Sequence, residues 1–178
     1  MNPALVPQWS SCLEGASMNP LSMMGLRSNR WLLWAEKNSG KTMIFIMFSA
    51  FGLRLLSSLF QNPLHWPDSN AYHNLAVSIL TSGIYANTHW APIYPYFLAF
   101  LYSLFGVNIQ IIIVIQSIIG SMTCFLLFLI GKNLFNVRIG ILSAVLLAFY
   151  PFHVFLSGVI LTEVIFIFLL LIWIYLAV

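Results

Sequence analysis

Long apolar runs separated by short polar stretches make up most of the chain beyond its first 40 residues. The run from Thr42 to Phe60 predicts a membrane span, because about 20 apolar residues cross a hydrocarbon core of about 30 Å. Residues 109–131 are almost unbroken apolar and, at about 1.5 Å per residue, are also long enough to span. Two further helices are expected at 139–159 and 163–178. The pattern therefore predicts an all-α membrane protein with about four transmembrane helices.

Residues 61–108 interrupt this pattern and are predicted to form a loop outside the membrane core. Within it, Asp68 to Ser82 reads as a short amphipathic helix that ends at Gly83, a residue suited to a left-handed helix cap. The apolar stretch 93–105 is too short for a span and carries several tyrosines, which favour the membrane interface. We expect one or two short interfacial helices in this loop.

Basic residues set the expected orientation. Lys37 and Lys41 precede the first span, and Lys132 and Arg138 lie between the second and third. The positive-inside rule places both groups on the cytoplasmic side, with two crossings between them. Residues 1–41 then form a cytoplasmic tail, residues 42–178 form the membrane domain, and the loop 61–108 is extracytoplasmic.

Composition excludes several classes of protein. The 178 residues are 61% hydrophobic and only 6% charged, whereas soluble domains are about 25% charged. A soluble enzyme, a disordered tail and a nucleic-acid-binding module are therefore excluded. The net charge of +3 comes from only seven basic residues and forms no patch for nucleic acid. We expect an integral, multi-pass protein in contact with membrane lipids, in the plasma (inner) membrane of a bacterium or the endoplasmic reticulum membrane of a eukaryote.

Asp68 is the first candidate for chemistry. It precedes an amphipathic run, so it can be an ordinary N-cap of that helix. Alternatively, a carboxylate beside the membrane can act as a general base or bind a metal. Tyr72 lies four residues later on the same helix face and reads as an interfacial anchor or as a residue of the same site.

Glu163 and Arg54 are charges placed among apolar residues. Acids within membranes tend to face the protein interior and to be functional, but Glu163 also follows Thr162 as a favourable helix-start acid. The same topology puts Glu163 on the side of Asp68. Arg54 lies toward the outer end of the first span, where it can snorkel to the headgroups or contact a lipid phosphate.

Three histidines share the outer loop with Asp68: His65, His73 and His89. Their spacings of eight and sixteen residues match no compact ligand pattern. We therefore predict no metal site and no cofactor, and a divalent ion stays an open alternative that the spacing does not support.

Two further features are interpreted as contacts between helices and not as parts of a functional site. His153 beside Pro151 is expected to be packed or hydrogen-bonded at a helix bend. Gly140, Ala144 and Ala148 form a stripe of small residues, which favours close approach of two helices.

Several short motifs follow one another in a recognisable order after Arg54. They are Pro67-Asp68-Ser69-Asn70-Ala71-Tyr72, Ala91-Pro92-Ile93-Tyr94-Pro95, Gly131-Lys132-Asn133-Leu134-Phe135, Tyr150-Pro151-Phe152 and Leu161-Thr162-Glu163. This order resembles the N-terminal part of the polytopic GT-C glycosyltransferases. The resemblance is strongest to the group of dolichyl-phosphate-mannose protein mannosyltransferases and the bacterial aminoarabinose transferase of lipid A.

The resemblance implies hexosyl or pentosyl transfer from a polyprenyl-phosphate-linked sugar to a lipid, glycan or protein acceptor on the extracytoplasmic side. It implies a catalytic role for Asp68 and substrate-binding roles for Glu163, Arg54 and Tyr72. His89 stands in the stretch where such enzymes commonly carry an arginine, so His89 joins the substrate-binding candidates. Such enzymes usually have more spans, so we expect this chain to be an N-terminal fragment that lacks transferase activity alone.

Two other functions fit the same pattern. The chain can be a non-catalytic helical membrane protein, truncated or small, that acts as a partner in a larger complex. It can also be a segment of a transporter that uses Glu163 as a proton relay, although transporters tend to pair intramembrane charges.

Overall fold

The computed structural model describes residues 30–85 and 89–178, and within them the chain is helical, with no strand. The described helices are α3 (Arg30–Lys37), α4 (Ser39–Ser58), α5 (Pro67–Ser82), α6 (Ile93–Phe105), α7 (Ile109–Leu134), α8 (Val137–Ala148), α9 (Pro151–Leu156) and α10 (Glu163–Ala177). The predicted all-α class is confirmed.

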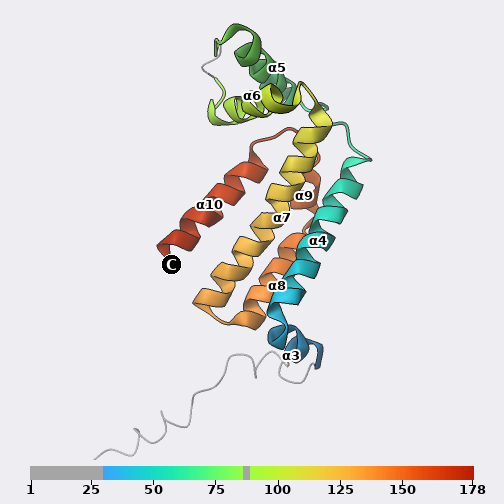
Figure 1. The fold of residues 1–178 in the computed structure, drawn as a ribbon, viewed down its shortest axis with the longest axis vertical. Helices are drawn as coiled ribbons and strands as arrows, with labels where there is room; N and C mark the ends of the chain where they lie inside the picture. The colour runs from blue at the N-terminus through green and yellow to red at the C-terminus, as the bar shows by residue number, and fades with distance from the viewer. Residues whose placement is uncertain (1–29, 86–88) are drawn as a thin grey trace, which may run out of the picture.

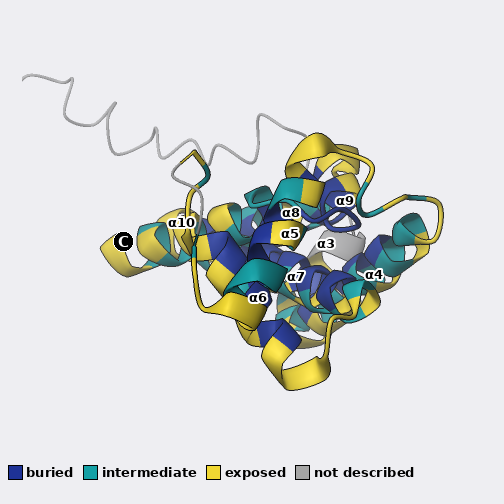
Figure 2. Cartoon of the chain, turned by 90° about the horizontal axis from the view of Figure 1, so that it is seen from above, coloured by how far each residue is buried: buried dark blue, intermediate teal, exposed yellow. Residues whose placement is uncertain are grey.

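The helices form a bundle capped at one end (Figure 1). The central helix α7 packs against α4, α8 and α10, and α9 continues the direction of α8. Helices α5 and α6 pack against each other and lie across one end of the bundle, whereas α3 lies at the other. Figure 2 shows that buried positions line the inside of the bundle, while α10 consists of exposed and intermediate residues and buries only Val164.

Two of the described helices, α4 and α7, are long and apolar enough to cross a membrane. They coincide with the first two predicted spans. The single helix predicted at 139–159 is instead two helices, α8 and α9, because Pro151 lacks the N–H that a helix interior needs and opens α9. Helix α10 lies within the fourth predicted span but is one of the shorter apolar helices, and the number of crossings stays a prediction.

The end of the predicted tail is ordered. Helix α3 occupies residues that were assigned to the cytoplasmic tail from the sequence, and α4 begins at Ser39, before the expected boundary. Residues 1–29 of that tail lie outside the described residues.

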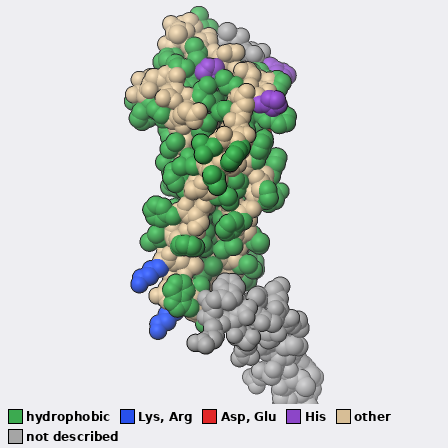
Figure 3. Space-filling model, turned by 90° about the vertical axis from the view of Figure 1, so that its right-hand side faces the viewer, with side chains coloured by type: hydrophobic (Ala, Val, Ile, Leu, Met, Phe, Trp, Pro, Cys, Tyr) green, Lys and Arg blue, Asp and Glu red, His purple; other side chains and the backbone are tan. Residues whose placement is uncertain are grey.

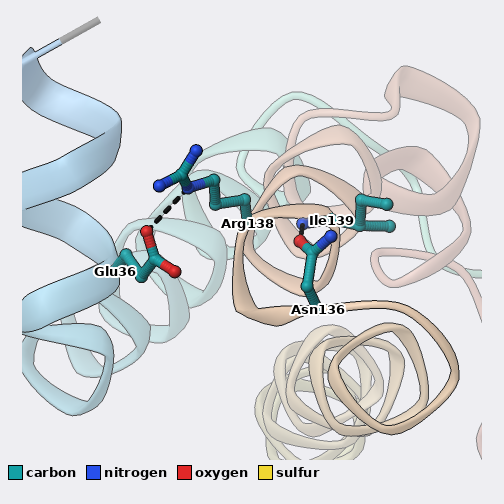
Figure 4. Close-up of polar contacts among 4 residues, drawn as sticks. All are labelled: Glu36, Asn136, Arg138 and Ile139. Atoms are coloured by element: carbon teal, nitrogen blue, oxygen red, sulfur yellow. Dashed lines mark hydrogen bonds and ion pairs between the residues drawn. The ribbon is translucent and has the colours of Figure 1, made fainter. Parts of the chain in front are cut away.

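An ion pair holds α3 against the start of α8. The Arg138 Nε donates to the Glu36 carboxylate at 2.6 Å, and the Asn136 side chain beside it caps α8 by accepting from the Ile139 N–H (Figure 4). The segment before α4 and the turn between α7 and α8 therefore lie at the same end of the bundle. On the face drawn in Figure 3, basic side chains lie at this end and histidines at the other.

Small residues allow α7 and α8 to approach closely. Ala144 and Ala148 are buried, and the Cα of Gly140 lies 2.9 Å from where a Cβ on Gly131 would stand. A Cβ on Gly140 would stand 2.6 Å from the Phe128 carbonyl oxygen. The stripe predicted from the sequence is thus a helix-packing surface.

Replacement of Gly140 by Ala is expected to destabilise the protein by about 1–3 kcal/mol, because the added methyl group meets backbone and forces the helices apart. The measurement is unfolding in detergent micelles. The matched control is Gly52→Ala on α4, where no atom lies within 4 Å of the new methyl; it should be neutral or stabilising, because alanine suits a helix better than glycine. Equal stability of the two variants would contradict the close α7–α8 contact.

Candidate functional site

Asp68 lies in the first turn of α5, at the capped end of the bundle. Trp66 occupies the N-cap position, Pro67 opens the helix, and no side chain makes a capping hydrogen bond. The interpretation of Asp68 as the N-cap is therefore wrong, because Pro67 occupies the first helical position and the N-cap is Trp66, two residues before Asp68. Gly83 ends the helix with a φ of 70°, as predicted. The Asp68 side chain is exposed and benefits from the positive end of the helix dipole.

Tyr72 is the residue that connects the two predicted carboxylates. It is buried, and its ring packs edge-on against Tyr94 with centroids 5.0 Å apart. Burial raises the pKa of the Tyr72 hydroxyl, a side-chain hydrogen bond with Thr162 opposes this rise, and the charges of Glu163 and Asp68 raise it further. Two acids that lie far apart in the sequence therefore act on one hydroxyl group.

Glu163 begins α10, with Thr162 at its N-cap position. The carboxylate is half-buried, and the Thr162 hydroxyl donates to its Oε2 at 3.4 Å. Glu163 is therefore an acid in the first turn of a helix, which is one of the two interpretations that the sequence offered. Its proximity to Tyr72 places it beside the capping helices as well.

A mainly apolar cavity of about 500 Å³ opens beside these residues. It lies between α7, α10 and the capping segment, which is the part of the chain that carries α5 and α6 (residues 61–85 and 89–108). Its lining is Tyr72, Ala91, Ile93, Tyr94, Phe97, Ile119, Thr162, Ile165, Phe166, Phe168 and Leu169. Tyr72 and Thr162 give the cavity hydroxyl groups next to the two carboxylates. An apolar cavity with a few polar groups at one side is typical of a site that binds an amphipathic ligand.

Arg54 lies inside the bundle and has no exposed surface. Its guanidinium donates to the Ala50 carbonyl and to His153 Nδ1, each at 2.9 Å, and lies 3.8 Å from Cys124 Sγ. The snorkelling interpretation is wrong, because Gly120 leaves room for the guanidinium, and His153 offers it an acceptor. His153 is hydrogen-bonded next to the helix bend, as predicted. Arg54 does not line the cavity.

The histidines of the capping segment do not converge. His73 accepts or donates a hydrogen bond with the Tyr102 hydroxyl at 2.9 Å, and burial lowers its pKa. His89 is exposed and packs edge-on against Trp90, whose carbonyl accepts from the Tyr85 hydroxyl. Within residues 30–85 and 89–178, no group of three or more metal-ligating side chains lies close together.

Sequence reasoning missed Tyr94, Thr162 and Gln116. Gln116 is one of two glutamines in the apolar run 109–131, and it directly follows five consecutive apolar residues, which was a usable signal. It has no exposed surface, and its two amide atoms bond to Tyr94 and to the Val159 carbonyl. The pairing of these residues across helices was not visible in the sequence.

A comparison with models of protein families gives a match to the second half of the chain. The family model described as dolichyl-phosphate-mannose-protein mannosyltransferase matches residues 89–178, which is just over half of the chain. Searches of curated proteins and of solved structures found no match. The matched part contains Tyr94, Thr162 and Glu163, whereas Asp68 and Tyr72 precede it.

Proposed function

The chain belongs to the dolichyl-phosphate-mannose-protein mannosyltransferase family, whose members are membrane glycosyltransferases, and we propose that it forms part of an enzyme of this kind. The proposed reaction moves a sugar from a polyprenyl-phosphate donor to an acceptor on the extracytoplasmic side. The observation that supports this proposal is the grouping of Asp68, Tyr72 and Glu163 beside an apolar cavity. A lipid-linked sugar needs both an apolar and a polar environment.

The proposed step is a single displacement at the anomeric carbon. A hydroxyl or amine of the acceptor forms a bond to that carbon, and the bond to the phosphate oxygen breaks. Asp68 accepts the proton that the acceptor loses, and its exposure leaves it accessible to an acceptor that arrives from the aqueous side. The polyprenyl phosphate leaves with the bonding electron pair.

Glu163, Tyr72 and His89 are proposed to bind the substrates. A half-buried carboxylate and a phenol hydroxyl can each hydrogen-bond sugar hydroxyls. The apolar cavity accommodates part of the isoprenoid chain. His89 can donate a ring N–H to the phosphate, and it lies two residues before Ala91, which lines the cavity. Arg54 has no exposed surface on which a phosphate could bind in this arrangement. It is therefore proposed to contribute to substrate binding indirectly, from inside the bundle.

The proposed topology has four crossings: α4, α7, the pair α8–α9, and α10. Lys37, Lys41 and Lys132 are exposed and lie in or beside the segments that the Glu36–Arg138 ion pair brings together. The positive-inside rule supports a cytoplasmic location for this end. Helices α5 and α6 then lie at the extracytoplasmic surface.

Transfer of label from a lipid-linked sugar tests this function. Membranes from cells that make the complete enzyme, of which this chain is proposed to form part, are incubated with radiolabelled mannosyl-phosphoryl-polyprenol, and label is followed into lipid, glycan and protein fractions. Transfer is expected with these membranes and not with membranes from cells that lack the gene. The same comparison is made with a panel of other hexosyl and pentosyl donors. The proposal is wrong if no donor gives more transfer in membranes with the enzyme than in membranes from cells that lack the gene.

A further inference from the structure

Gln116 lies in the N-terminal third of α7 and makes two hydrogen bonds to different parts of the structure. The Tyr94 hydroxyl of α6 donates to its Oε1, and its Nε2 donates to the Val159 carbonyl between α9 and α10; both distances are 2.9 Å. The amide has no exposed surface. One side chain thus joins a capping helix, the central helix and the segment that leads into α10.

Each end of this link leads to the candidate site. Tyr94 lines the cavity and packs edge-on against Tyr72. Val159 lies shortly before Thr162 and Glu163, and the next residue, Ile160, donates its N–H to the Pro63 carbonyl at 3.3 Å. The segment that carries Glu163 is therefore held both by α7 and by the start of the capping segment.

An amide in a membrane helix has a cost that an apolar residue avoids, because its polar atoms must leave water. Here both amide atoms have partners of fixed direction. Directional bonds determine how two segments sit relative to each other, whereas apolar contacts tolerate small shifts. The link lies where Asp68 and Tyr72 on α5 meet Glu163 on α10.

We propose that Gln116 is a positioning residue that fixes the Glu163 segment relative to Tyr72 and Asp68. It acts through Tyr94 on one side and through the Val159 carbonyl on the other. The proposal rests on the function proposed above for its catalytic consequence, although the mechanical link itself can be measured without any transfer assay.

A spin label at position 161 tests the mechanical link. Leu161→Cys is introduced together with Cys12→Ser; Cys124 is fully buried and so protected from the reagent. Gln116→Met should increase the mobility of the label, whereas Gln116→Glu should not, because a neutral carboxyl has one donor and one acceptor for the same two partners.

Gln110→Met on the exposed side of α7 is the matched control and should leave mobility unchanged. A second label, at Asn133→Cys at the opposite end of α7, should be unaffected in every variant and reports general unfolding.

Transfer kinetics test the consequence. Gln116→Met and Tyr94→Phe should each lower kcat about tenfold or more, with KM for the donor changed less than about twofold, because misplacement of reacting groups slows the chemical step. The double variant should be no slower than the slower single variant. Unchanged mobility at position 161 in Gln116→Met overturns the proposal, as does unchanged kcat. If Gln116→Met increases the mobility of the label at position 161 but the wild-type protein shows no sugar transfer, the mechanical link is supported and the proposed function is rejected.

Discussion

Replacement of Asp68 by Asn is expected to lower the rate of sugar transfer at least about a hundredfold, because a general base contributes about 10²–10⁴ to the rate. Asparagine has nearly the same shape but cannot accept the proton of the acceptor. The side chain is exposed in the first turn of α5, so the substitution should leave the fold intact. Initial transfer rates in membranes with matched protein levels give the measurement.

Glu163→Gln is expected to reduce transfer as well, with a larger share of the loss in KM, because Glu163 is proposed to bind the sugar. The control is Glu36→Gln, which makes the same change at the opposite end of the bundle and breaks the pair with Arg138. Its transfer rate should stay within about twofold of wild type, since surface ion pairs contribute little. Wild-type rates in both Asp68→Asn and Glu163→Gln would remove these residues from the site.

The second large effect concerns the buried arginine. His153→Leu is expected to destabilise the protein by at least about 2 kcal/mol, because it leaves a guanidinium donor of Arg54 without its acceptor inside the bundle. Unfolding in detergent micelles gives the measurement. His65→Leu at an exposed position is the control, with an expected change within about 0.5 kcal/mol.

The double variant distinguishes a lost contact from a general packing defect. Replacing both partners by apolar residues of similar size removes the unmet donor together with the lost acceptor, which can be nearly neutral. Arg54→Met combined with His153→Leu should therefore be more stable than His153→Leu alone. Additive destabilisation by the two substitutions would show that the hydrogen bond does not couple the residues.

The long spans and the C-terminal end of α5 were predictable because they depend on local signals. Membrane helices follow from runs of apolar residues, and α5 ends at Gly83, whose preference for a left-handed backbone is intrinsic. The start of α5 at Pro67 was missed, although proline at the first helical position is also a local signal. The break between α8 and α9 also has a local cause in Pro151, although the sequence analysis treated that region as one helix. Helix α3 was missed because eight residues form too short a window for a periodic pattern.

The candidate site was predictable only in part. The positive-inside rule predicted that Asp68 and Glu163 share one side, and the structure places both near Tyr72. The cavity and the Gln116 link depend on which helices become neighbours, which no single segment encodes. Arg54 shows the same limit, because its partners His153 and Cys124 come from helices far along the chain.

Labelling from outside the membrane tests the central claim most directly, namely that both carboxylates lie at the extracytoplasmic end of the bundle. One cysteine at a time is placed at position 68, 163 or 132 in a Cys12→Ser background, in which the remaining Cys124 is buried. A membrane-impermeant thiol reagent is then added to sealed, right-side-out vesicles. We predict that positions 68 and 163 react at once, and that position 132 reacts only after permeabilisation. Protection of either carboxylate position together with position 132 would contradict the account.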